Sequence, residues 1–355
     1  MIKFLLAPFS WLYALIIQIR HVFFDWGILR SKSYSFPVIS IGNLALGGTG
    51  KTPHTEYLVQ LLLEQKMKIA ILSRGYGRKT KGYLNADESH SDASAIGDEP
   101  AQFYHEFAKH IQIAVDGNRR RGIEKIMSSP PKPDAILLDD AMQHRYVKPG
   151  ISILLTDYRN LYVDDHMVPY GKLRDVKSAS KTADIIVVTK TDTVLSPIIR
   201  RYILNKLKPR GHQRVYFSFF RYGKLVSVPG FKKKEWDKKY SVIVLFTGIA
   251  NPYPIKDYLR DYCNELITIS FPDHHVFSKK DVELIRRKYE EQFTRKKLVI
   301  TTEKDAMRLI NSPYLRMLED LPLFYLPIEV KFHGQDGRAF NNQIIQYVRE
   351  NKPNS

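Results

Sequence analysis

The sequence of 355 residues predicts an α/β protein built on a mostly parallel sheet that is flanked by helices. Three observations favour this class. Short apolar runs typical of buried strands recur between residues 34 and 192, and helical or loop patterns separate most of them. One of these runs ends in a glycine-rich turn that opens a helix. A second set of such runs begins at residue 240, so we expect a second, smaller α/β domain.

The first element, residues 1–30, is the most apolar part of the chain. Only 16 residues separate Lys3 from Arg20, and a helix of that length spans roughly 24 Å, less than the roughly 30 Å of a bilayer core. Two interpretations stay open: a helix packed on the protein's own core, or an amphipathic helix in a membrane interface. The second would place these aromatic and basic side chains at the headgroups: Trp11, Tyr13, Trp26, Arg20, His21 and Arg30.

Residues 31–210 are predicted to form the first α/β domain. A buried strand is expected within 34–44, followed by a loop and a helix with Pro53 in its first turn and apolar residues on one face. Further strands are expected within 68–78, 111–115, 135–140, 151–157 and 184–192. The polar, Ser- and Asp-rich stretch 82–100 is expected to be a long surface loop.

The pattern of apolar and charged residues changes near 205–215, where we place a domain boundary. Residues 213–231 read as a strand pair around Tyr222-Gly223, so 211–235 is expected to be a β-hairpin linker. Residues 236–355 are then predicted to form the second α/β domain.

The stretch "NLALGGTGKTP" (43–53) predicts a phosphate-binding loop and, with its flanking strand and helix, a P-loop NTPase-like fold. Ala45 stands where the usual G-x-x-x-x-G-K-[ST] pattern has its first glycine. Lys51 is expected to reach the β- and γ-phosphates of ATP, and the Thr52 hydroxyl is expected to bind Mg²⁺. The predicted nucleotide-binding residues are Gly47, Gly48, Thr49, Gly50, Lys51 and Thr52.

Two carboxylates follow the apolar run at 135–138 and are candidates for the same metal ion. Asp139 and Asp140 come at the end of a predicted buried strand. Mg²⁺ prefers hard oxygen ligands and keeps several waters, so one or two carboxylates suffice.

A net charge of +18 and a single cysteine restrict the function classes. The lone Cys263 excludes an internal disulfide framework. The charge fits a phosphorylated substrate or an anionic membrane. Nucleic acid is disfavoured because the aromatic residues gather in the apolar N-terminus rather than among basic residues. A P-loop GTPase is an alternative, but in "VVTKTD" Thr189 stands where the guanine-reading Asn of N-K-x-D is expected.

The motifs "GNLALGGTGKTP", "SRGYGR", "GDEP", "DDAMQH", "FPDHH" and "TTEKDA", in this order, closely resemble those of the tetraacyldisaccharide 4'-kinases of lipid A synthesis. The resemblance extends from the N-terminus to about residue 330. It implies an ATP- and Mg²⁺-dependent enzyme that phosphorylates the 4'-hydroxyl of an acylated disaccharide 1-phosphate. It also implies a peripheral protein on the cytoplasmic face of the bacterial inner membrane, with its N-terminal helix in the bilayer surface and no obligate protein partner.

The resemblance assigns roles to individual positions. Asp98 and His274 match the proposed catalytic pair, which together with Lys51 would act on the reacting groups. Taken alone, Asp98 could equally be a helix cap, and His274 could be an ordinary loop histidine. Asp175 of "KLRD" stands where the family has a metal-organising Glu. The residues expected near the acceptor are Asn43, Arg74, Tyr76, Arg119, His144 and Arg174.

Overall fold

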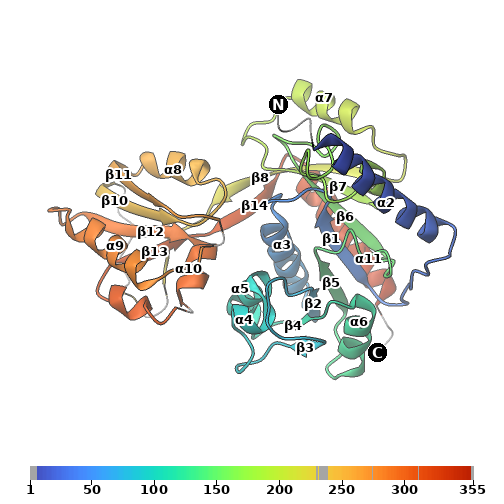
Figure 1. The fold of residues 1–355 in the computed structure, drawn as a ribbon, viewed down its shortest axis with the longest axis horizontal. Helices are drawn as coiled ribbons and strands as arrows, with labels where there is room; N and C mark the ends of the chain where they lie inside the picture. Colours follow the sequence, from blue (N-terminus) through green and yellow to red (C-terminus); the bar gives the residue numbers. More distant parts are fainter. Residues whose placement is uncertain (1–5, 229–230, 232–238, 274, 311, 353–355) are drawn as a thin grey trace. The chain divides into compact units, whose positions relative to one another are not determined.

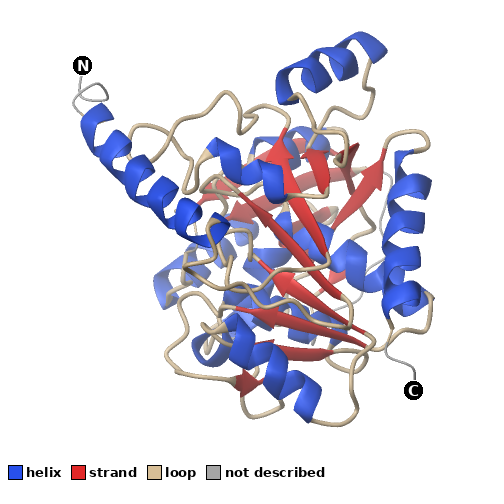
Figure 2. Cartoon of the chain, turned by 90° about the vertical axis from the view of Figure 1, so that its right-hand side faces the viewer, coloured by secondary structure: helices blue, strands red, loops and turns tan. Residues whose placement is uncertain are grey.

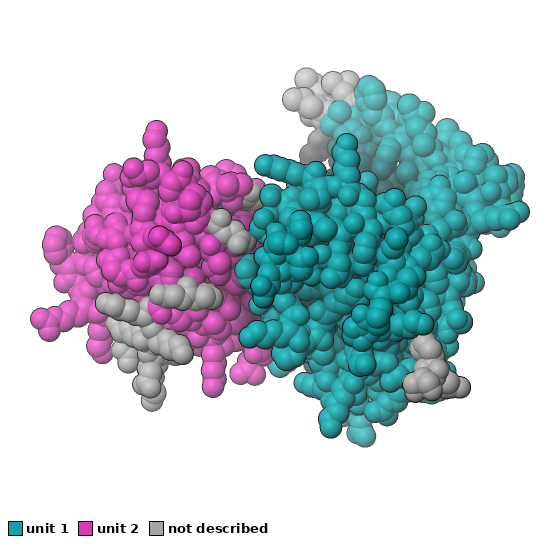
Figure 3. Space-filling model, turned by 90° about the horizontal axis from the view of Figure 1, so that it is seen from below, with its two compact units in different colours: residues 1–220, 330–355 teal, residues 221–329 magenta. Residues whose placement is uncertain are grey.

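The computed structural model describes residues 6–228, 231, 239–273, 275–310 and 312–352. The chain forms two compact units (Figure 3), each with its own sheet. Unit 1 comprises residues 1–220 and 330–355, and unit 2 comprises residues 221–329.

Unit 1 contains a nine-stranded sheet in the order β14-β8-β7-β6-β1-β5-β2-β4-β3 (Figure 1). The pairings from β8 through β4 are all parallel. The strands are β1 (Val38–Asn43), β2 (Ile69–Ser73), β3 (Leu84–Asn85), β4 (Gln112–Val115), β5 (Ala135–Asp139), β6 (Ile151–Asp157), β7 (Ile185–Thr189), β8 (Arg214–Tyr222) and β14 (Ile328–Phe332). Every strand predicted between residues 34 and 192 is therefore confirmed.

Helices cover both faces of this sheet (Figure 2). They are α2 (Ala7–Asp25), α3 (Lys51–Glu64), α4 (Ala93–Ile96), α5 (Asp98–Phe107), α6 (Arg119–Ser128), the 3₁₀ helix η1 (Lys177–Thr182), α7 (Pro197–Leu207) and α11 (Asp336–Asn351). Residues of α3, α5 and α11 join one hydrophobic cluster, whereas residues of α2 and α7 join another.

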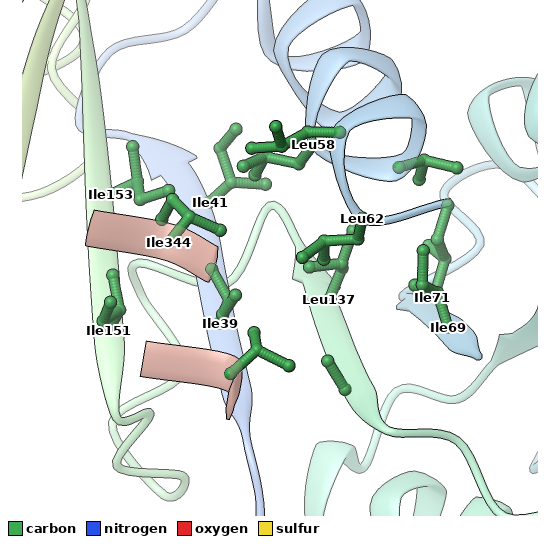
Figure 4. Packing of buried hydrophobic residues seen from close by; sticks show 14 of the residues in the cluster. Ile39, Ile41, Leu58, Leu62, Ile69, Ile71, Leu137, Ile151, Ile153 and Ile344 are labelled. Atoms are coloured by element: carbon green, nitrogen blue, oxygen red, sulfur yellow. The ribbon is translucent and has the colours of Figure 1, made fainter. Parts of the chain in front are cut away.

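The sheet has two buried faces because its strands are apolar at successive positions. Ile39 and Ile41 of β1 face the α3 side, where Leu58 and Leu62 pack on them (Figure 4). Val38 joins a different cluster, on the opposite face. Near-continuous apolar strands are typical of parallel sheets covered on both sides. The fold class predicted from the sequence is confirmed.

Unit 2 contains a five-stranded sheet in the order β11-β10-β12-β13-β9. Its strands are β9 (Val226–Ser227), β10 (Tyr240–Thr247), β11 (Cys263–Ser270), β12 (Lys297–Thr302) and β13 (Leu323–Leu326). Its helices are α8 (Tyr253–Arg260), α9 (Lys279–Glu290), α10 (Glu303–Ile310) and the 3₁₀ helix η2 (Leu315–Leu318). The expected second α/β arrangement is present, with α8 on one face and α9 and α10 on the other.

The expected hairpin around Tyr222-Gly223 is wrong. β8 belongs to the nine-stranded sheet, whereas β9 pairs with β13 in the other sheet. On its other side from β7, β8 pairs with β14. The two strands run antiparallel, since His333 N–H donates to the Phe217 carbonyl and Gly223 N–H donates to the Pro327 carbonyl.

The C-terminal end of the predicted second domain also differs from the structure. Residues 330–355 return to unit 1. There α11 buries Phe340, Ile344 and Val348 in the same cluster as β1 and α3. The boundary of unit 2 near residue 329 therefore follows from the apolar packing of α11 on the sheet that contains β1.

The stretch 82–100 is not a plain loop. It contains β3, which pairs antiparallel with β4, and the short helix α4. Ala95 and Ile96 are buried, which explains why this polar stretch is ordered against the sheet.

The N-terminal helix α2 has a buried face and an exposed apolar face. Its inner face buries Ser10, His21 and Phe24. Its outer face exposes Phe9, Leu12, Ile16, Ile19 and Phe23, whose alternating three- and four-residue spacing forms a single stripe. Among the described residues, no helix has the length and apolar character needed to cross a bilayer.

Candidate functional site

The phosphate-binding loop follows the central strand β1 and leads into α3, as predicted. Gly47 and Gly50 adopt positive φ angles of 99° and 90°, which glycine tolerates best. Gly48 does not adopt a positive φ angle. The first amides of α3 begin at Lys51, so the loop ends in N–H groups that have no partner within the helix.

The structure explains why alanine is accepted at position 45. Ala45 forms an antiparallel bridge with Leu173, flanked by hydrogen bonds from Leu46 to Lys172 and from Arg174 to Leu44. This part of the loop is extended, so a residue with a Cβ fits as well as glycine does.

Polar side chains at or just after the ends of β1 and β7 hold the loop through hydrogen bonds. Asn43 donates from Nδ2 to Thr49 Oγ1 at 2.8 Å, and Thr189 donates from Oγ1 to the Thr49 carbonyl at 2.8 Å. Lys190 donates to the Gly48 carbonyl. Thr189 is therefore committed to supporting the loop, which is a different role from reading a guanine base.

Asp139 ends β5 next to the loop and is almost completely buried. Its Oδ2 accepts a hydrogen bond from Ser73 Oγ at 3.3 Å, whereas its Oδ1 has no hydrogen-bond donor among the described residues. Burial, followed by the negative charges of Glu99 and Asp140, raises the pKa of Asp139 to about 7. A cation beside Oδ1 would supply the missing partner.

Asp140 is held differently from its neighbour. Its carboxylate accepts two hydrogen bonds from Arg174, and Lys51 Nζ lies 3.8 Å from its Oδ1. Burial alone would raise the pKa of Asp140, but hydrogen bonding to Arg174 and the charge of Lys51 outweigh burial and lower it. Asp140 is therefore a charged carboxylate, and its contacts hold the side chains of Lys51 and Arg174 beside the loop.

These residues fit Mg²⁺ better than a metal held by a protein cage. Among the described residues, no group of three or more His, Cys, Asp or Glu side chains could hold a metal ion. Mg²⁺ commonly takes one or two carboxylates, with water and phosphate completing its shell. Asp139 Oδ1 supplies such an oxygen, and Thr52 lies in the first turn of α3 beside the loop.

The motifs "SRGYGR" and "GDEP" meet at the same edge of the sheet. A Cβ at Gly97 would lie 2.8 Å from the Tyr76 carbonyl oxygen, so only glycine allows this close approach. Asp98 follows directly and is the first residue of α5, while Gly97 occupies the N-cap position. Asp98 is exposed and is not the helix cap that it could have been.

Three of the predicted acceptor residues form a basic group near the carboxylates. Arg119 is buried and donates from Nη2 to the Asp139 carbonyl at 3.2 Å. Burial, followed by the charges of Arg119 and Arg74, lowers the pKa of His144 to about 4. Arg74 is exposed beside them. This group can attract an anionic ligand, and His144 is neutral at physiological pH.

The remaining predicted acceptor residues divide into two kinds. Tyr76 is 86% exposed and free of the core, as a ligand-contacting side chain at a strand end can be. Asn43 is fully buried and accepts a hydrogen bond from Arg174 at 2.6 Å. Asn43 and Arg174 thus connect the loop to Asp140 through hydrogen bonds inside the protein.

Asp175 does not join the carboxylate pair in the way expected of a metal ligand. Its Oδ1 accepts a hydrogen bond from His21 Nε2 at 2.7 Å, and Arg145 donates to His21 Nδ1 at 2.9 Å. His21 is therefore buried against the protein, and its expected position at a lipid headgroup is wrong. Tyr13 likewise donates to the Arg174 carbonyl rather than facing outward.

His274 lies outside the described residues, so its predicted role rests on the sequence. Its neighbours in unit 2 are well held: His275 stacks on Phe271 and donates to Asp281 Oδ2 at 2.9 Å. The structure also gives roles to residues that the sequence left without one: Ser73, Glu99 and Gln143, which lie within the motifs that carry the family resemblance, and Lys190, which lies outside them. Each acts through an interaction with a residue distant in sequence, which a local motif does not specify.

The arrangement in unit 1 can therefore bind a polyphosphate at the loop and a hard cation at Asp139, and Asp98 is an exposed carboxylate in the same unit. These are the parts that phosphoryl transfer requires, since catalysis there depends on positioning and on stabilising charge.

Comparisons with known proteins agree with this geometry. The family model described as Tetraacyldisaccharide-1-P 4'-kinase matches residues 2–349. The chain is 46% identical to the tetraacyldisaccharide 4'-kinase of Bacteroides thetaiotaomicron, covering 99% of this chain and 94% of that protein. It is 44% identical to that of Flavobacterium johnsoniae, covering 99% and 98%.

A solved structure shows the same fold. The crystal structure of LpxK from Aquifex aeolicus in complex with ATP is 26% identical in sequence, with a TM-score of 0.73, and the alignment covers 98% of this chain and 99% of that one. With the family match and the relatives above, this leads to one conclusion: the chain belongs to the tetraacyldisaccharide-1-P 4'-kinase family.

Proposed function

We propose that unit 1 transfers the γ-phosphate of ATP to the 4'-hydroxyl of a tetraacyl disaccharide 1-phosphate. The observation that carries this proposal is the juxtaposition of the glycine loop, Asp139 Oδ1 and the Lys51–Asp140 pair at one edge of the sheet. In the reaction, the 4'-oxygen bonds to the γ-phosphorus while the bond to the β–γ bridging oxygen breaks. ADP leaves with that oxygen.

The loop and Lys51 would bind the triphosphate. Backbone amides from Gly47 to Thr52 and the positive end of α3 favour the phosphate oxygens. Asp139 and Thr52 would hold Mg²⁺, with Asp140 acting mainly by placing Lys51 and Arg174. Bound Mg²⁺ would offset the negative charge that the β- and γ-oxygens carry during transfer.

Asp98 would orient the acceptor hydroxyl and accept its proton. It lies at the start of α5, whose next residue, Glu99, raises the pKa of Asp139 through its charge. An ordinary carboxylate is a weak base, but a loose transition state needs orientation more than early deprotonation. We assign His274 the role of sharing that proton, on the sequence motif alone.

Other parts of unit 1 would bind the 1-phosphate of the acceptor and contact its acyl chains. Arg74 and Arg119 offer positive charge near the site, and Tyr76 offers an exposed ring. The outer stripe of α2 would rest in the surface of the inner membrane on its cytoplasmic side. An apolar helix face of this kind, on a protein of charge +18, suits an anionic leaflet.

The experiment is a transfer assay with γ-labelled ATP, Mg²⁺ and a tetraacyl disaccharide 1-phosphate in detergent. Wild-type protein is expected to label the lipid. Asp98→Ala should lower kcat by about a hundredfold or more while the KM for ATP stays close to wild type. Lys51→Ala should impair both parameters, because Lys51 contacts the nucleotide. Folded wild-type protein that labels no lipid, or an Asp98→Ala loss confined to ATP binding, contradicts the proposal.

A further inference from the structure

His54, in the first turns of α3, is buried and makes two hydrogen bonds that no part of the predicted chemistry uses. Its Nδ1 lies 2.7 Å from the Gly50 carbonyl oxygen, and its Nε2 lies 2.9 Å from Ser218 Oγ on β8. All three residues belong to unit 1. Only 2% of the His54 surface is exposed.

These contacts fix the tautomer of the ring. A carbonyl oxygen can only accept, so Nδ1 carries the hydrogen and donates it to Gly50. Nε2 is then the acceptor, and the Ser218 hydroxyl donates to it. With two hydrogen bonds and almost no contact with solvent, the ring is held in this orientation.

The Gly50 carbonyl controls the next amide of the loop. In a trans peptide the C=O of one residue and the N–H of the next point in opposite directions. The Gly50 carbonyl accepts the helical hydrogen bond from the His54 backbone N–H at 3.2 Å, and the contact from His54 Nδ1 at 2.7 Å adds to it, so the Lys51 N–H is directed the other way. That N–H is one of the first in α3 and has no partner within the helix, so it is available for phosphate.

Gly50 also depends on its surroundings in a second way. Its φ of 90° is unfavourable for residues with a Cβ, and a Cβ there would lie 2.7 Å from the Phe220 ring. The Phe220 ring and His54 therefore enclose this glycine from neighbouring positions. The peptide is held by contacts from α3 and β8 before any nucleotide arrives.

We propose that His54 is a positioning residue for nucleotide binding, which fixes the Gly50–Lys51 peptide so that the Lys51 amide points into the phosphate site. Ser218 supports it by fixing the ring tautomer. The inference rests on the proposed function, since it concerns the binding of ATP to this loop.

Two substitutions separate the hydrogen bonds. In His54→Asn the side-chain amide lies near the position of Nδ1 and can still donate to Gly50. In His54→Gln the amide lies near the position of Nε2, so the contact with Ser218 is retained and the one with Gly50 is lost. His110→Gln serves as the matched control, because His110 is exposed and lies in the turn that follows α5.

The test is titration with a fluorescent ATP analogue and Mg²⁺ in the absence of lipid, together with steady-state kinetics and melting temperatures. His54→Asn is expected to bind within about threefold of wild type, and His54→Gln about tenfold more weakly, as loss of one hydrogen bond predicts. The KM for ATP should rise in parallel, with a smaller change in kcat. Ser218→Ala should weaken binding about threefold, which provides a second test if His54→Gln is unstable.

Equal binding by wild type and folded His54→Gln would overturn the inference, as would His54→Asn binding as weakly as His54→Gln. Wild-type affinity in Ser218→Ala would count against the tautomer argument. Wild-type protein that binds no nucleotide would contradict the proposed function itself, and the lipid-free titration distinguishes that failure from the others.

Discussion

At the scale of single residues, two adjacent carboxylates have opposite electrostatic environments. Asp139 is buried near Glu99 and Asp140, whereas Asp140 is hydrogen-bonded by Arg174. A protonated Asp139 could not hold the proposed Mg²⁺, so a pKa near 7 predicts that metal and protons would compete for this group.

The pH dependence of Asp139→Asn tests this environment. The native carboxyl has a pKa of about 7 and the unfolded one titrates near 3.8, so the native state retains a proton that the unfolded state releases between these values. Stability from this group is present at low pH and is lost as the pH rises through 7. Without Mg²⁺, Asp139→Asn should therefore raise Tm at pH 8 and have little effect near pH 4.

Asp140→Asn is the matched control, because the lowered pKa of Asp140 reverses the sign. Its charge stabilises the native state above the ordinary carboxyl range and is lost as the pH falls. Asp140→Asn should lower Tm at pH 8. A fall in Tm for both variants at pH 8 would show that Asp139 is stabilised as a carboxylate, contrary to our interpretation.

Asp305 of "TTEKDA" has a structural role in unit 2 that the sequence left unassigned. Its Oδ2 accepts from Gly248 N–H at 2.9 Å and from Thr302 Oγ1 at 2.6 Å, and its Oδ1 accepts from Arg308 at 3.1 Å. The fully buried carboxylate thus joins the end of β10 to the start of α10.

Asp305→Ala is expected to lower the free energy of unfolding by about 3 kcal/mol, because it leaves the buried Gly248 N–H and Thr302 hydroxyl without their acceptor. Lys304→Ala, at the neighbouring position, should change it by less than about 0.5 kcal/mol. Urea unfolding monitored by circular dichroism measures both. Equal losses in the two variants would contradict this role for Asp305.

At the scale of elements, α2 has a buried side that packs on unit 1 and an exposed apolar side for which we propose contact with a membrane surface. The inner side is fixed by Tyr13 and His21, which bond to the segment carrying Arg174 and Asp175. The outer side exposes a stripe of large apolar residues, a feature that usually marks an interaction surface. The two interpretations of the N-terminus that the sequence left open are therefore compatible with each other.

Substitution of the outer stripe tests the proposed membrane contact. Leu12→Ser with Ile16→Ser should reduce binding to anionic vesicles by about tenfold or more, since each large apolar side chain contributes about 1.5–3 kcal/mol on full burial. Phe293→Ser is the control, because Phe293 is fully exposed in unit 2 and outside this stripe. Cosedimentation measures binding. Unchanged binding by a folded double variant, or equal loss in the control, would contradict the assignment.

Elements were predictable from the sequence where the signal is local. The strand–glycine loop–helix unit around Lys51 and the carboxylates after β5 depend on neighbours in sequence and were found. The pairing of β8 with β14 and the hydrogen bond of His21 to Asp175 were not found. They join residues more than a hundred positions apart, and packing free energy rather than local preference selects them.

At the scale of the whole molecule, the chain distributes its tasks over two α/β units. Unit 1 holds the loop, both carboxylates, Asp98 and α2, so every described residue of the proposed site except the surroundings of His274 belongs to it. A net charge of +18 favours the approach of ATP and of an anionic leaflet alike.

The most direct measurement is a crystal structure of the wild-type chain with a non-hydrolysable ATP analogue and Mg²⁺. We expect the β- and γ-phosphates to lie within hydrogen-bond distance of the amides of residues 47–52 and of Lys51 Nζ, with the metal bound by Asp139 Oδ1. A nucleotide bound elsewhere with this loop empty, or a metal that avoids Asp139, would contradict the proposed site.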